Sequence, residues 1–141
     1  MNGVFSELNS IYNYEKLREN MLLEMARVGF IDDEYEVYIH TDDPGNVPHF
    51  HIWDAETRGQ KFHTCIRIES PEYFHHTGKE DYLNSSMRKE LIKFLKSKPT
   101  KLKRYNTNWE VVVDMWNANN SKANVPDDLP MPDYTKLPRE K

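Results

Sequence analysis

The 141-residue sequence predicts one α+β domain, in which a three-stranded antiparallel meander packs against an N-terminal helix and two C-terminal helices. Three observations predict this architecture. Polarity alternates over residues 35–68, helical periodicity flanks that stretch on both sides, and four prolines fall within residues 122–141. We therefore expect a single domain over residues 1–121, followed by an extended Pro-rich tail over 122–141.

The first helix is expected over Tyr14–Val28. Leu17 and Met21 begin a series of apolar residues at the spacing of one helical face, and Val28 ends it. Gly29 then supplies a residue that accepts the left-handed conformation found after many helices.

Three strands are expected at residues 35–40, 49–53 and 61–68, because these stretches are rich in β-branched and aromatic residues. Pro44 and Gly45 mark the turn between the first two strands. The connections are short, which favours antiparallel pairing of neighbouring strands.

Strand alternation assigns the faces of this sheet. If Val37, Phe50, Ile52 and Ile66 point to the core, the alternate residues point away from it. Those alternate residues are Tyr38, His40, His49, His51, Trp53, His63, Cys65 and Arg67. Four histidines are therefore expected together on the outward face.

Two helices follow the sheet. Apolar residues at helical intervals predict one from residue 81 to 97, which Pro99 terminates. Thr107 and Glu110 have the spacing of a capping box, so a second helix should begin there and end near Asn119.

His49 and His51 form the sharpest motif for chemistry. On a strand, the imidazoles of a His-x-His pair stand on the same side and can share one zinc, iron or copper ion, with His40 or His63 as a third ligand. A divalent metal is therefore a candidate cofactor. The alternative is a sheet face that histidines cover without any metal.

The charge distribution is uneven, although the net charge is only −4. Basic residues concentrate between residues 88 and 104, and acidic residues dominate elsewhere. The basic candidates for contact with nucleic acid are Arg88, Lys93, Lys96, Lys101, Lys103 and Arg104. Such a stretch suits phosphates or an acidic partner, but it is also typical of a solvated helix face.

Several classes are disfavoured. The sequence has no apolar run of the roughly 20 residues needed to span a bilayer, and its first ten residues lack the features of a signal peptide. A single cysteine cannot form an intramolecular disulfide. We expect a cytoplasmic protein without membrane contact. Cys65 lies near His63, but nothing marks an oxyanion hole, so no catalytic residue is assigned.

The Pro48-His49-Phe50-His51 strand, together with the strand ending at Ile68 and the later helices, resembles the domain of unknown function 4160 family. The resemblance covers roughly Tyr35 to Asn117, and its four-residue motif is the specific part. It implies a short bacterial protein of the kind often encoded on mobile elements, beside small regulatory or toxin and antitoxin-like genes. It implies no particular activity.

Three functions remain open. The lack of a complete catalytic set favours a noncatalytic binding or inhibitor protein, encoded by a phage or mobile element and acting on a host defence protein. The residues expected to contact that partner are Tyr38, Trp53, Arg67, Tyr73, Phe74, Leu129, Met131 and Tyr134. The alternatives are a metal-dependent hydrolase or nuclease built on His49 and His51, and a nucleic-acid-binding protein.

Overall fold

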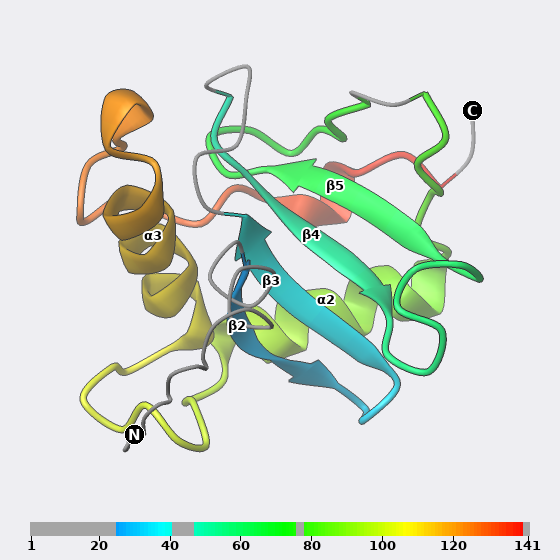
Figure 1. Cartoon of the computed structure of the whole chain (residues 1–141), viewed down its shortest axis with the longest axis horizontal. Helices are drawn as coiled ribbons and strands as arrows, with labels where there is room; N and C mark the ends of the chain where they lie inside the picture. The colour runs from blue at the N-terminus through cyan, green and yellow to red at the C-terminus, as the bar shows by residue number, and fades with distance from the viewer. Residues whose placement is uncertain (1–24, 41–46, 76–77, 140–141) are drawn as a thin grey trace.

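One antiparallel sheet organises the fold. The structure is a computed structural model that describes residues 25–40, 47–75 and 78–139 (Figure 1). The sheet has the order β2-β3-β4-β5. Its strands are β2 (Met25–Ile31), β3 (Tyr35–His40), β4 (His49–Asp54) and β5 (His63–Arg67). The three predicted strands are confirmed as a meander, and a fourth strand precedes them.

That fourth strand, β2, corrects the prediction of a helix through Val28. Residues 25–28 belong to β2, which pairs with β3, and the pairing register shifts between Arg27 and Gly29. This bulge interrupts the two-residue alternation, so the apolar residues of β2 imitate helical spacing in the sequence. Gly29 is a strand residue here rather than a helix stop. Residues 14–24 of the predicted helix lie outside the described residues.

The two later helices are α2 (Ser85–Lys96) and α3 (Asn108–Asn119). The structure starts α2 four residues later than predicted, because Asn84 caps it by accepting a hydrogen bond from the Met87 N–H at 2.8 Å. At α3 the predicted cap at Thr107 is confirmed, but the reciprocal bond of a capping box is not, because Glu110 bonds the residue before the cap. Thr107 Oγ1 accepts from the Glu110 N–H at 3.2 Å, and Glu110 Oε1 accepts from the Asn106 N–H at 2.8 Å.

The hydrophobic core lies between the sheet and these helices. Figure 1 shows α2 on one side of the sheet, together with the tail segment that carries η2 (Tyr134–Lys136). The predicted inward residues Val37, Phe50, Ile52 and Ile66 are all buried in this core. None of the helices within the described residues has the length and apolar character needed to cross a bilayer.

The Pro-rich tail returns to the domain. After η1 (Ser121–Ala123), its residues Val125, Tyr134 and Leu137 enter the hydrophobic core. Hydrogen bonds fix its path, because Leu129 O accepts from Trp109 Nε1 at 2.8 Å and Tyr134 OH donates to Arg67 O at 2.6 Å. The tail is therefore part of the folded unit up to residue 139.

Candidate metal centre

The centre of the histidine face is buried, and two of its four histidines, His40 and His63, are half-buried. His49 is 1% exposed, His51 3%, Tyr38 1% and Cys65 0%. The assignment of these residues to one face is confirmed by the strand pairing. The prediction that these four residues are exposed to solvent is wrong. The alternation of residues along a strand shows which side of the sheet each side chain occupies, but not what covers that side.

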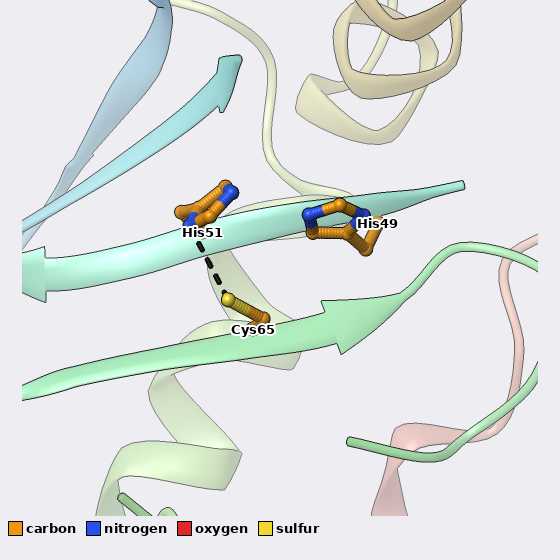
Figure 2. Close-up of side chains that lie close together, drawn as sticks. All are labelled: His49, His51 and Cys65. Atoms are coloured by element: carbon orange, nitrogen blue, oxygen red, sulfur yellow. Dashed lines mark hydrogen bonds between the residues drawn. The ribbon is translucent and has the colours of Figure 1, made fainter. Parts of the chain in front are cut away.

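His51 and Cys65 are the centre of this cluster. They lie directly opposite each other on β4 and β5, and the Cys65 Sγ is 3.3 Å from His51 Nδ1 (Figure 2). His49 stands two residues before His51 on the same side of β4. One donor atom from each of these three residues lies within 4.8 Å of the others. Figure 2 shows His49 and His51 on β4 and Cys65 on the neighbouring β5, with the contact between His51 and Cys65 drawn as a dashed line.

His63 adds a further donor from β5. Its Nε2 lies 3.0 Å from His51 Nδ1 and 3.8 Å from Cys65 Sγ. The ring centroids of His51 and His63 are 5.3 Å apart and their planes differ by 11°. The distance between the ring centroids exceeds the distance between the two nitrogens by about the width of one ring. The two rings therefore lie edge to edge, with His51 Nδ1 facing His63 Nε2. Two imidazoles in this arrangement share one proton in an N–H···N hydrogen bond.

The separations among these donors bracket those around one tetrahedral ion. Zinc bonds of about 2.0–2.1 Å to nitrogen and about 2.3 Å to sulfur place neighbouring donors about 3.3–3.6 Å apart. The three observed separations among His51, His63 and Cys65 run from 3.0 to 3.8 Å. In the structure, His51 Nδ1 and His63 Nε2 face each other. Both rings must therefore turn before their nitrogen lone pairs can point at one ion.

Aromatic rings surround His51. The Tyr38 ring lies 4.8 Å from it at an angle of 15°, and the His40 ring meets it edge-on at 4.6 Å. Neither His40, a predicted candidate ligand, nor His63 belongs to the close group of His49, His51 and Cys65. His63 nevertheless places its Nε2 near two of those donors, whereas His40 meets His51 with its ring. His40 and Tyr38 therefore pack around the donors.

An ion pair between the buried Glu36 and the exposed Arg27 lies near the cluster. Glu36 accepts a hydrogen bond from Trp53 Nε1 at 2.9 Å and pairs with Arg27. Trp53 in turn lies 6.4 Å from the His63 ring, between centroids. Glu36 is only 4% exposed, and Arg27 compensates its charge. This carboxylate is therefore committed to Arg27 and Trp53 and is not a candidate ligand.

The residues predicted to contact a protein partner pack within this chain. Tyr38 and Tyr134 are each 1% exposed, which corrects the expectation that they are presented to a partner. They are large aromatic residues that the sheet and the tail enclose. The other six are half-buried: Trp53, Arg67, Tyr73, Phe74, Leu129 and Met131.

The basic residues occupy two settings. Arg88 Nη1 donates to Leu137 O at 2.7 Å and so ties α2 to the tail. Arg104 is exposed, and its Nη2 donates to the hydroxyl of the neighbouring Tyr105 at 2.7 Å. Four lysines are exposed, two on α2 and two on the loop after it: Lys93, Lys96, Lys101 and Lys103.

Cys65 is the donor that sequence reasoning missed as a ligand. The alternation of β5 placed it on the histidine face, but its position opposite His51 depends on the register of the β4–β5 pair. The register follows from how the turn between these strands folds, which the sequence motif did not specify.

A scan against protein-family models, a search of curated proteins and a search of solved structures found no match to this chain.

Proposed function

We propose that this protein binds one transition-metal ion of the zinc or copper(I) type, held by His51, His63 and Cys65, with His49 as a fourth donor. The observation that carries the proposal is the separation of 3.0 to 3.8 Å among three donor atoms that come from two paired strands. A thiolate with imidazoles favours zinc and copper(I) over magnesium or calcium, which prefer oxygen donors.

The burial of the donors supports retention of the ion rather than hydrolysis. A catalytic metal keeps one coordination position open for water and substrate. Of the three donors, Cys65 is fully buried, His51 is 3% exposed and His63 is half-buried. A nuclease or hydrolase substrate would need a path to the ion, and a small ion does not. The proposed role is therefore noncatalytic metal binding.

Protons compete with the ion at this site. The proton shared by His51 and His63, and the thiol proton of Cys65, must leave before three lone pairs can reach a metal. Metal affinity should therefore fall as the pH is lowered. Each binding event should release protons to the buffer.

The test is a titration of the untagged protein with cobalt(II), followed by competition with zinc. We expect one ion per chain and a thiolate-to-metal absorption band in the near ultraviolet, which zinc then abolishes. Cys65→Ser should lose the band, and His51→Ala or His63→Ala should weaken binding at least about tenfold. His75→Ala is the matched control, because His75 is an exposed histidine paired with Glu80 outside the cluster.

A failure to fold must be separated from a failure to bind. Each variant is therefore compared with the wild type by circular dichroism before titration. The proposal is wrong if the folded wild type binds none of zinc, cobalt, nickel and copper(I) at micromolar concentration. It is also wrong if folded Cys65→Ser retains both the band and the affinity.

A further inference from the structure

A second feature, separate from the metal centre, is a groove beside β2. It encloses about 500 Å³ between β2, the end of α2, the loop after it and α3. Its apolar lining comes from Val28, Phe30, Phe94, Leu102 and Met115. We call this feature the edge groove. Its volume falls in the range of about 300–1,000 Å³ that is common for ligand sites.

Exposed apolar side chains gather at the edge groove. Phe30 is 40% exposed and Leu102 is 37% exposed, and these are the two large hydrophobic residues that are exposed within the described ranges. Single exposed apolar residues are ordinary on protein surfaces, but two that line one groove mark a surface suited to a partner.

Backbone polar groups also face this groove. Four consecutive residues of β2, Arg27 to Phe30, line it, and β2 is the terminal strand of the sheet among the described residues. Among the described residues β2 pairs with β3 alone, so the N–H and C=O groups on its other side are the ones that an added strand would pair with. Extended peptides bind many proteins in this way.

The rim of the edge groove is positively charged. Lys98 and Lys101 line it, against one acidic residue, Asp33, and a further cation, Arg27, is already paired with Glu36. Lys98 is held in place, because its Nζ donates to Lys103 O and Tyr105 O at 3.2 Å each. Lys101 is exposed. An occupant with negative charges would therefore complement this rim.

We infer that the edge groove binds an extended acidic peptide segment of another protein, which adds a strand to β2. Such a segment would use the β2 backbone, place an apolar side chain against Phe30 and Leu102, and offer carboxylates to the lysines. A nucleic acid would use the lysines but would leave the strand edge and the apolar lining without partners. A second copy of this chain, paired edge to edge, would bring two basic rims together and repel itself.

The experiment measures fluorescence anisotropy of a labelled peptide of about six residues, a common strand length, in which glutamate alternates with valine or phenylalanine. We expect saturable binding that weakens with salt. The same peptide with N-methyl groups on alternate residues cannot pair with a strand, and its binding should be lost.

Two variants and a control locate the site. Lys101→Glu should weaken binding of the acidic peptide about fivefold at low salt, and Leu102→Asp should weaken it further. Lys122→Glu, an exposed lysine of η1 outside the groove, should leave the affinity unchanged. Both groove residues are exposed, so their variants should fold.

Several results would overturn the inference. They are equal binding of the N-methylated peptide, no effect of Lys101→Glu, and no saturable binding of the acidic peptide. Binding of a single-stranded DNA oligonucleotide in its place, or a dimer in analytical ultracentrifugation that Leu102→Asp disrupts, would assign the groove to a different occupant.

Discussion

At the scale of single residues, Asp54 shows how one side chain can shape a turn. It ends β4 and is 8% exposed. Its carboxylate accepts hydrogen bonds from the backbone N–H groups of Thr57, Gly59, Lys61 and Phe62 at 2.8 to 3.2 Å. The hydrogen bond from the Thr57 hydroxyl, followed by these backbone bonds, holds the pKa of Asp54 well below its usual range, against the opposing effect of desolvation.

Asp54→Asn should lower the melting temperature by several degrees at neutral pH, because an amide offers one acceptor oxygen where the carboxylate offers two. The folded-state pKa lies below the unfolded value of 3.8, so the stability from the carboxylate is complete above that value. It is lost as the pH falls through the folded-state pKa. Melting curves over this range test the sign: the gap between wild type and variant should narrow below about pH 4. A gap that widens in acid would contradict the account.

At the scale of elements, the sequence predicts what short-range rules control. The α3 cap could be recognised because Thr107 and Glu110 are three residues apart, and Thr107 accepts the expected bond from Glu110. The Glu110 carboxylate bonds the N–H of Asn106 instead of that of Thr107. The strand β2 could not be recognised from the sequence, because a bulge disrupts the alternation of its residues and its pairing with β3 is a tertiary contact. The observed start of α2 differs from the predicted one for a local reason, because Asn84 acts as the N-cap.

The close approach of β2 and α2 gives a prediction for Gly29. A Cβ atom at this position would lie 2.9 Å from Phe94 Cζ, which is too close for ordinary packing. Gly29→Ala should therefore destabilise the protein by about 1–3 kcal/mol, measured by urea denaturation. The double variant Gly29→Ala with Phe94→Leu should lose less than the sum of the two single variants. Additive losses would show that the two residues do not interact in this way.

At the scale of the whole molecule, the tail and the histidine face depend on contacts between distant segments. The pattern placed four histidines on one face, and strand pairing confirms it. It did not reveal that the centre of this face is buried or that Cys65 stands opposite His51, because coverage and register belong to the assembled fold. The predicted bacterial family, host-protein partner and cytoplasmic location rest on sequence alone and stay predictions.

The tail provides a test at this scale. Leu137 is 1% exposed and lies in the core, so Leu137→Ala should cost about 2–5 kcal/mol in the free energy of unfolding. The exposed neighbour Lys136 is the matched control, and Lys136→Ala should change stability by less than about 0.5 kcal/mol. Equal effects of the two variants in urea denaturation would mean that the tail does not dock on the domain in solution.

The most direct test of the metal centre is X-ray absorption at the zinc edge of the zinc-loaded, untagged protein. The proposed ligands predict one sulfur scatterer at about 2.3 Å and nitrogen scatterers at about 2.0–2.1 Å. In Cys65→Ser the sulfur scatterer should disappear. A first shell made up of nitrogen and oxygen alone in the wild type, with a spectrum that Cys65→Ser leaves unchanged, would contradict the account.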